Sequence, residues 1–296
     1  MTPFWPLYIE PVLRAQMPDR VMQIGAGDGE ISLRLLDYCR ETGCRADIID
    51  PRASASVQEA LAAHGEEHAF QRLQPWKAVP LGDPPDLVLL DGEPNWWAVF
   101  ILLDRLRRLA GEREHTFPIV LAHHVAWPYG RRDMYPAPEA VGEPHAFAYL
   151  GVDPDHPGLV QDGLNSGFAH ANHEGGPQNG VLTALEDFVA SAPLELELRV
   201  LPLLSGLGIL APVSRITKEL RTMINGFAAP DACAQAVEAA SREALRLAAR
   251  LAETEARLER RTVALTRARE LLAQQEADLL GLRQRLAGKA GPGSAG

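Results

Sequence analysis

The sequence predicts an α/β fold with a mostly parallel sheet that is covered by helices on both faces. Apolar runs with the length of buried strands lie at 20–24, 45–50, 76–80, 86–91 and 117–123. Amphipathic helical patterns alternate with them and lie at 5–16, 30–42, 54–63 and 95–110. Such alternation is typical of parallel sheets. Two more apolar runs around Ser205-Gly206 predict a closing antiparallel hairpin.

Composition limits the class of protein. The chain has 296 residues, is 46% hydrophobic and carries a net charge of −10, which is unevenly distributed. Residues 213–296 hold 14 basic and 10 acidic side chains, so 15 and 29 remain for residues 1–212. This acidic part disfavours nucleic acid as a partner and favours a small or neutral ligand.

Nothing in the sequence points to a membrane or to an oxidising compartment. No apolar stretch approaches the ~20 residues that span a bilayer, and the start lacks the basic and cleavage regions of a leader peptide. The three cysteines (Cys39, Cys44 and Cys233) show no metal-binding spacing and no disulfide framework. We therefore expect a reduced, cytoplasmic protein.

The most informative motif is the segment VMQIGAGDGEISLRLL at 21–36, in which Gly25, Gly27 and Gly29 connect a strand to a helix. Glycine permits positive φ there and lets a ligand approach the backbone. A second apolar run ends at Asp50, where an acid of nucleotide-binding α/β folds holds ribose hydroxyls. The dinucleotide fingerprint is incomplete, because Glu30 occupies the position of its third glycine.

This motif resembles the first motif of class I S-adenosylmethionine (SAM)-dependent methyltransferases. Gln23 stands where that family usually has an acid. The resemblance covers about residues 15–212 and implies a Rossmann-like seven-stranded sheet. SAM would be held by Gln23, Gly25, Gly27, Gly29, Asp50 and Asp91.

Two further segments narrow the resemblance. LLDGEPNWW ends the fourth expected strand, and VLAHHVAWPYGRRDMY ends the fifth. They are similar to the macrocin and sugar O-methyltransferase group of bacterial methyltransferase domains, whose acids after these strands hold Mg²⁺. Carried over, Asp91 is a metal ligand, Glu93 a candidate base, and His123 and His124 occupy the positions of the acidic pair.

The histidines leave three hypotheses open. Asp91, His123 and His124 can form a two-histidine, one-carboxylate metal site, but only where the chain departs from strand geometry, because adjacent strand residues face opposite ways. Alternatively, one histidine is a general base without a metal. A purely structural pair is the third possibility.

Residues 124–180, called the lid below, are rich in Pro, Gly, His and aromatic residues and show little periodicity. A long insert after a strand of the sheet is usually functional, so we expect it to bind the acceptor substrate. Its stacking and hydrogen-bonding side chains suit a sugar or polyol. The candidates are Trp127, Tyr129, Arg131, Arg132, Asp133, Tyr135, His173 and Glu174.

The C-terminal part has a different pattern. Leucines recur every seven residues from Leu251 to Leu286, as in a coiled coil, whereas the second seam contains Arg261 and Gln275. We expect a methyltransferase domain at 1–212, a linker at 213–230, a helical extension at 231–288 and a disordered tail at 289–296. The extension is predicted to mediate homo-oligomer formation or to bind a partner helix.

Together these patterns predict a SAM-dependent methyltransferase, most simply an O-methyltransferase acting on a hydroxyl of a sugar, glycan or natural product. A divalent metal is an optional cofactor. Two alternatives remain: an inactive methyltransferase-like scaffold that acts through the helix, and an NAD-dependent reductase.

Overall fold

The computed structural model describes residues 1–64, 68–79, 83–227 and 229–289. It divides into two compact units, Met1–Ala240 and Ser241–Gly296. Among the described residues, no helix is both long and apolar enough to cross a membrane.

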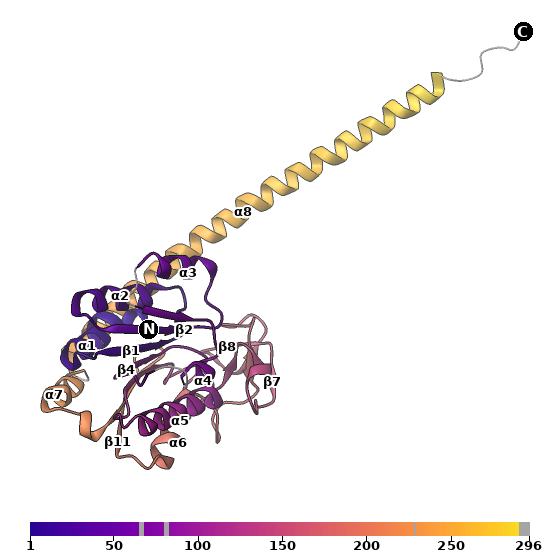
Figure 1. The fold of residues 1–296 in the computed structure, drawn as a ribbon. Coiled ribbons are helices and arrows are strands. Elements are labelled where there is room, and N and C mark those ends of the chain that lie inside the picture. The colour runs from indigo at the N-terminus through magenta and orange to yellow at the C-terminus, as the bar shows by residue number, and fades with distance from the viewer. Residues whose placement is uncertain (65–67, 80–82, 228, 290–296) are drawn as a thin grey trace, which may run out of the picture. The chain divides into compact units, whose positions relative to one another are not determined.

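A seven-stranded sheet forms the centre of the first unit, in the order β11-β12-β5-β4-β1-β2-β3 (Figure 1). The strands β1 to β5 run parallel, and β12 of the closing hairpin pairs antiparallel with both β5 and β11. This is the Rossmann-like, mostly parallel sheet that the sequence predicts. The strand bounds are β1 Arg20–Ile24, β2 Arg45–Ile49, β3 His68–Gln71, β4 Leu87–Leu90, β5 Ile119–His123, β11 Leu196–Leu201 and β12 Leu207–Pro212.

Helices cover both faces of this sheet because alternate strand residues point to opposite sides. Val21 and Leu89 pack in one apolar cluster with α1, α2, α3 and α7, whereas Met22 and Val88 pack in the other with α4, α5 and α6. The helix bounds are α1 Glu10–Gln16, α2 Glu30–Thr42, α3 Ala55–Ala62, α4 Pro75–Ala78, α5 Trp96–Glu112, α6 Val181–Ser191 and α7 Lys218–Gly226.

The third parallel strand was predicted in the wrong place. The apolar run at 76–80 is not a strand: Pro75–Ala78 is the short helix α4, because Pro75 supplies a favourable first helical residue and Trp76 and Ala78 bury their side chains. The third parallel strand is instead β3, whose residues are only partly buried and thus lack an apolar pattern. Residue 80 lies outside the described residues.

The cysteine prediction also differs from the structure. Cys39 near the end of α2 and Cys44 before β2 are paired as a disulfide, with their Cα atoms 4.6 Å apart. Gly43 adopts φ 77° between them and turns the chain, so the two thiols meet although their spacing gave no signal.

The lid contains small strands rather than an irregular loop. The strands β6 (Met134–Tyr135), β10 (Ala169–Ala171) and β7 (Phe147–Ala148) form one sheet, and β8 (Gly151–Asp153) pairs with β9 (His156–Val160). A 3-10 turn, η4, spans Pro138–Ala140. The lid follows β5 directly, so its first residues stay beside the sheet.

The segment expected to be a linker at 213–230 is folded. A 3-10 turn (η5, Val213–Arg215) leads into α7, in which Leu220 and Ile224 are buried, and Phe227 packs edge-on against Tyr8 at 4.9 Å between ring centroids. The first unit therefore extends past the expected boundary at residue 212. The helix α8 spans Pro230–Lys289, and most of the expected tail lies outside the described residues.

We expect Leu220→Ala to lower the free energy of unfolding of the first unit by about 2–5 kcal/mol, because it opens a cavity under α7. Asn225→Ala, an exposed change on the same helix, is the control and should stay within about 0.5 kcal/mol. Urea unfolding of both variants measures this. Equal, small effects would mean that α7 does not belong to the folded unit.

Candidate functional site

The glycine turn connects β1 to α2 in a backbone conformation that side chains disfavour. Gly25, Gly27 and Gly29 have φ values of 87°, 56° and 89°. A Cβ on Gly25 would lie 2.1 Å from the carbonyl oxygen of Asp91. Glycine is therefore required at this position, because it lets the ends of β1 and β4 approach each other.

Asp50, at the end of β2, closes this turn from the other side. Its Oδ2 accepts a hydrogen bond from the Ala26 amide at 2.8 Å, and its Oδ1 accepts one from the Arg52 amide at 2.7 Å. Asp50 as a whole is only 8% exposed. Asp50 is thus held in one position at the mouth of the glycine turn.

A cavity of about 230 Å³ lies between these elements, at the point where β1 has β2 on one side and β4 on the other. Ligands of open α/β sheets bind at such a switch point outside the carboxyl ends of the strands. Three carboxylates and one guanidinium line it. The lining residues are Ile24, Gly25, Gly27, Asp50, Pro51, Arg52, Pro75, Asp91, Gly92 and Glu93.

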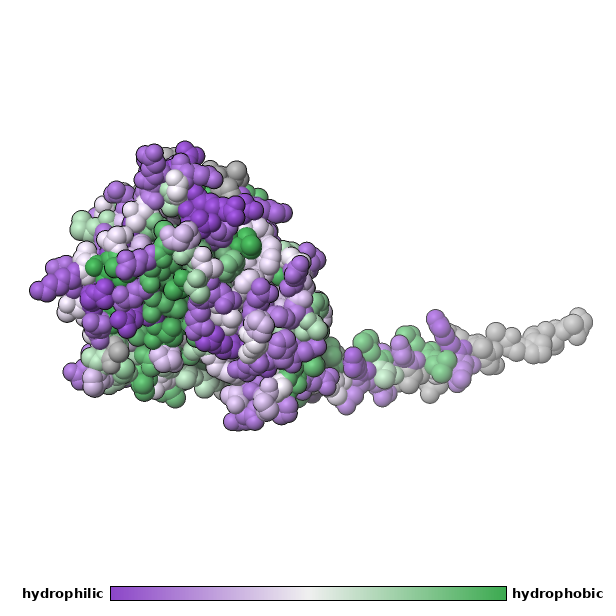
Figure 2. All heavy atoms as spheres, turned by 90° about the horizontal axis from the view of Figure 1, so that it is seen from below, coloured by the Kyte–Doolittle hydropathy of each residue, from purple (hydrophilic) through white to green (hydrophobic). Residues whose placement is uncertain are grey.

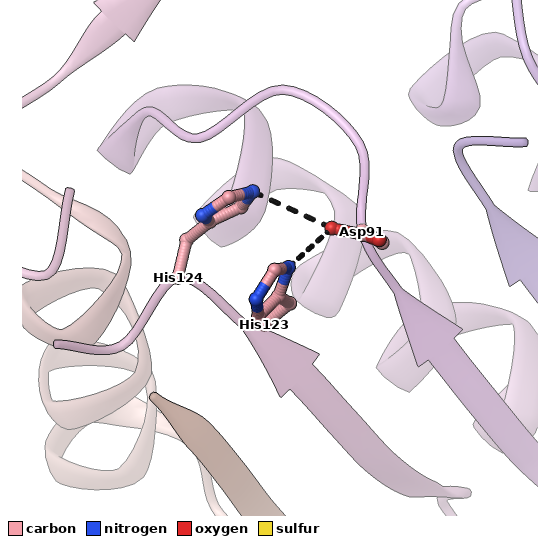
Figure 3. Close-up of side chains that lie close together, drawn as sticks. All are labelled: Asp91, His123 and His124. Atoms are coloured by element: carbon pink, nitrogen blue, oxygen red, sulfur yellow. Dashed lines mark hydrogen bonds and ion pairs between the residues drawn. The ribbon is translucent and has the colours of Figure 1, made fainter. Parts of the chain in front are cut away.

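Asp91 also belongs to a cluster with two histidines, shown in Figure 3. His123 Nδ1 lies 2.6 Å and His124 Nε2 3.4 Å from Asp91 Oδ1. The imidazole rings stack at 3.9 Å between centroids, and one potential ligand atom from each residue lies within 4.8 Å of the others. Both rings point toward the carboxylate, as a shared ligand would require.

The backbone explains how two adjacent residues face the same group. His123 is the last residue of β5, and His124 has φ 66°, outside the range of strands. The strand therefore ends between them, and the second ring turns back over the first. This departure from strand geometry is the condition that the metal hypothesis required.

The pKa values of Asp91 and His123 are both lowered, so both groups are deprotonated at neutral pH. Burial would raise the pKa of Asp91, but hydrogen bonds from His123 and His124 outweigh it and hold that pKa well below its usual value. Burial lowers the pKa of His123 to about 4, despite the hydrogen bond to Asp91. At neutral pH the cluster thus pairs an ionised carboxylate with a neutral imidazole.

The N-terminal segment contacts the same group. The amino group of Met1 lies 3.1 Å from Asp91 Oδ2, and the Phe4 ring packs edge-on against His123 at 5.6 Å between centroids. Both residues are buried. Sequence reasoning did not assign this segment to the site.

Glu93 lies on the cavity side rather than in the histidine cluster. Its Oε1 accepts a hydrogen bond from Arg52 at 3.2 Å, and its buried Oε2 has no partner among the described residues. Burial raises the pKa of this carboxyl, although Arg52 and Asn95 partly offset the effect. Sequence reasoning missed Arg52, whose place two residues after Asp50 was the available signal.

Gln23 supports the turn from within β1. Its Nε2 donates to the Gly25 carbonyl oxygen at 2.8 Å, and the side chain is buried. Gln23 and Gly29 do not line the cavity described above; Gly29 is the residue that precedes α2. Their contribution is to shape the turn.

The structure gives five of the expected lid residues partners within the protein. Asp133 accepts from the Trp96 and Gly180 amides at 2.7 and 2.6 Å and from Tyr135 Oη at 2.8 Å, which ties the lid to α5 and α6. Arg131 pairs with Glu186, and Arg132 donates to the Ala171 carbonyl oxygen at 2.7 Å.

Tyr129 is the fifth of these residues. Its buried Oη accepts a hydrogen bond from Asn165 at 2.6 Å and lies 3.3 Å from His170 Nε2. Its ring meets the His124 ring edge-on at 5.5 Å between centroids, so the lid packs directly on the histidine cluster. These five side chains therefore help to hold the lid in place.

The other three expected lid residues are accessible. Trp127 is 43% exposed, and His173 and Glu174 are also exposed. The Trp127–Pro128 peptide is cis, and the ring of His173 meets that of His145 at 5.1 Å. Glu174 pairs with Arg132 at 3.6 Å, and all three side chains keep exposed surface that an acceptor could contact.

A second cavity of about 230 Å³ lies at the start of α5, and sequence reasoning missed all but one of its residues. Its walls combine indole rings with two carboxylates. The lining residues are Trp96, Trp97, Asp133, Gly142, Glu143, His145 and Gln178.

No family model and no curated protein sequence matches this chain. Solved structures that resemble it include several methyltransferases, among them one from Podospora anserina with S-adenosylhomocysteine bound. That structure is 13% identical, with a TM-score of 0.42, over 71% of this chain and 77% of the other.

Two further resemblances have similar strength. A putative O-methyltransferase from Nostoc punctiforme is 16% identical, with a TM-score of 0.39, over 69% of this chain and 54% of the other. The 1,6-didemethyltoxoflavin N1-methyltransferase of Burkholderia thailandensis is 15% identical, with a TM-score of 0.37, over 68% of this chain and 75% of the other. Likenesses this low leave the function to be inferred from the residues described above.

The shifted pKa of His123 predicts a pH dependence of stability in metal-free protein. Between pH 6.5 and about 4, the unfolded chain binds a proton that the folded His123 does not, so the free energy of unfolding falls as the pH falls. The full loss is about 3 kcal/mol.

Urea unfolding at pH 7 and pH 4.5, in the presence of EDTA, measures this change. His123→Gln should flatten the dependence, whereas the exposed control His156→Gln should not. An unchanged slope in His123→Gln would contradict the assignment.

Proposed function

We propose that this protein is a methyltransferase that binds SAM in the cavity between the glycine turn, Asp50 and Asp91. The observation that carries the proposal is the contact of Gly25 with the Asp91 backbone, where a Cβ would lie 2.1 Å from the carbonyl oxygen. This contact places the glycine turn, Asp50 and the end of β4 around one cavity, and we assign Asp50 to the ribose of SAM.

The charge of the cavity favours SAM over a dinucleotide. Asp50, Asp91 and Glu93 line it against a single cation, Arg52. SAM carries a positively charged sulfonium, which such a cavity attracts, whereas the pyrophosphate of NAD carries negative charge and would be repelled. This balance supports the methyltransferase over the reductase.

Within this cavity each group has a distinct role. Asp50 is oriented in advance by the Ala26 and Arg52 amides, so it can accept hydrogen bonds from ribose hydroxyls without reordering. Gly27 leaves its face of the turn open, because a Cβ there would meet nothing within 4 Å. We assign Glu93 to the SAM side, beside Arg52, rather than to the acceptor base.

Transfer of a methyl group to a hydroxyl needs alignment and the removal of a proton. Asp91 lies between the cavity and the histidines, so a hydroxyl held at His123 and His124 would be next to bound SAM. The acceptor would reach this point under the lid, where Trp127, His173 and Glu174 remain accessible. A sugar or another polyol suits these stacking and polar groups.

The donor set of the cluster fits a divalent transition metal. Ligands must be deprotonated, and the cluster offers an ionised carboxylate and a neutral imidazole at neutral pH. Two imidazoles with one carboxylate suit Zn²⁺, Fe²⁺ or Mn²⁺ better than Mg²⁺. A metal bound there would supply a Lewis acid that lowers the pKa of the acceptor hydroxyl.

A metal-free base is the second candidate, and the His124 ring favours it. Its Nδ1 is buried and has no partner among the described residues, while its Nε2 faces Asp91. An imidazole oriented by a carboxylate in this way can accept a proton from a hydroxyl.

We expect SAM to bind with a micromolar Kd and Asp50→Ala to weaken it at least tenfold, about 1.4 kcal/mol. The loss follows from removing the fixed acceptor for the ribose. Isothermal titration calorimetry with SAM and with NADH measures both ligands, and Asp37→Ala, an exposed change on α2, is the control. Binding of NADH without SAM would overturn the proposal, and binding of neither ligand would support the scaffold alternative.

The metal hypothesis and the metal-free hypothesis predict different effects of His124→Ala on the binding of metal ions. We expect this variant to bind Mn²⁺ or Zn²⁺ at least tenfold more weakly while SAM affinity changes less than twofold, because His124 does not line the cavity. Calorimetric titration of the EDTA-treated protein measures both, with His156→Ala as the control. If neither ion binds the unmodified cluster, the metal-free base is the correct form.

A further inference from the structure

The described part of the second unit belongs to the helix α8, which has an exposed leucine stripe. Five leucines along α8, each between 55% and 65% exposed, recur every seven residues and so lie on one face. Figure 2 shows hydrophobic and hydrophilic side chains interleaved along this helix. The leucines are Leu251, Leu258, Leu265, Leu272 and Leu279.

The neighbouring stripe, three residues further along in each repeat, is mostly polar. Its members are exposed, and only the last is a large apolar residue: Thr254, Arg261, Ala268, Gln275 and Leu282. In a parallel, in-register pair of these helices, each position would meet itself. Arg261 would then face Arg261 of the second copy, and Gln275 would face Gln275, in layers without leucine.

An antiparallel pair removes both conflicts. With Leu251 opposite Leu282, the remaining leucines of one copy lie opposite Gln275, Ala268, Arg261 and Thr254 of the other. Every layer then contains a leucine, and no cation meets its own copy. The methylene stem of Arg261 can lie along Leu272 of the second copy while its head remains in water.

Charge supports the same alignment. Helical side chains lean toward the N-terminus, so Arg261 leans toward residue 257 of its own helix. In the antiparallel register that level is occupied by Glu276 of the second copy, an exposed acid. Because the arrangement has twofold symmetry, this pair occurs twice.

We propose that α8 binds a second copy of this chain as an antiparallel coiled coil, with the twofold axis between residues 265 and 268. This partner is self-complementary: the leucine stripe of each copy covers the weaker stripe of the other. The inference is independent of the function proposed for the first unit.

The first test is the oligomeric state of the full chain. Analytical ultracentrifugation over a micromolar range should show a dimer, and Leu265→Asp should raise its dissociation constant at least tenfold because both copies lose a central leucine. Val263→Asp, which removes an equally exposed apolar side chain from the opposite face, should change it less than threefold. A monomeric parent chain, or equal effects of the two variants, would overturn the proposal.

The second test is orientation. A spin label is attached at Leu251→Cys in a chain that also carries Cys233→Ser, which removes the unpaired thiol. At 1.5 Å per residue, the antiparallel register places the labelled positions about 46 Å apart, whereas a parallel pair places them within about 20 Å. Double electron–electron resonance measures the distance between the two labels, and a distance within about 20 Å would overturn the antiparallel arrangement.

Discussion

The close approach of Gly25 to the Asp91 backbone is the constraint on which the candidate site depends. A side chain at residue 25 would overlap the Asp91 carbonyl, so β1 and β4 could not end side by side. Parallel pairing of β1 with β4, and of β4 with β5, then carries this alignment to His123. The absence of a side chain at residue 25 thus allows the proposed SAM cavity and the histidine cluster to lie next to each other.

Asp91 is the residue that these two regions share. It lines the cavity, and its Oδ1 faces both imidazoles. Because hydrogen bonds keep it ionised while burial keeps His123 neutral, the cluster can ligate a metal or polarise an acceptor without first losing a proton. The lid packs on this cluster through Tyr129, and Asp133 anchors the lid to the two helices below it.

The parts that the sequence predicted share a physical cause. Buried parallel strands are continuously apolar and helices are periodic, so β1, β2, β4 and β5, with the helices α2, α3 and α5, were predicted to within about two residues. The 76–80 run failed because an apolar stretch of that length fits a buried helical turn equally well, and β3 was missed because it is half exposed. The segment that holds the nine-residue helix α7 was expected to be a linker, although Leu220 and Ile224 recur at helical spacing and are buried.

The sequence alone determined which residues gather at the carboxyl edge of the sheet, because parallel strands all end at the same edge. These residues are Gly25, Asp50, Asp91 and His123. Only the tertiary structure decided their orientation. It turned His124 back at φ 66°, placed Glu93 beside Arg52, and gave Arg131, Arg132 and Asp133 partners that hold the lid. The physical reason is that residue type sets what a side chain can bind, whereas burial and the nearest partner decide what it does bind.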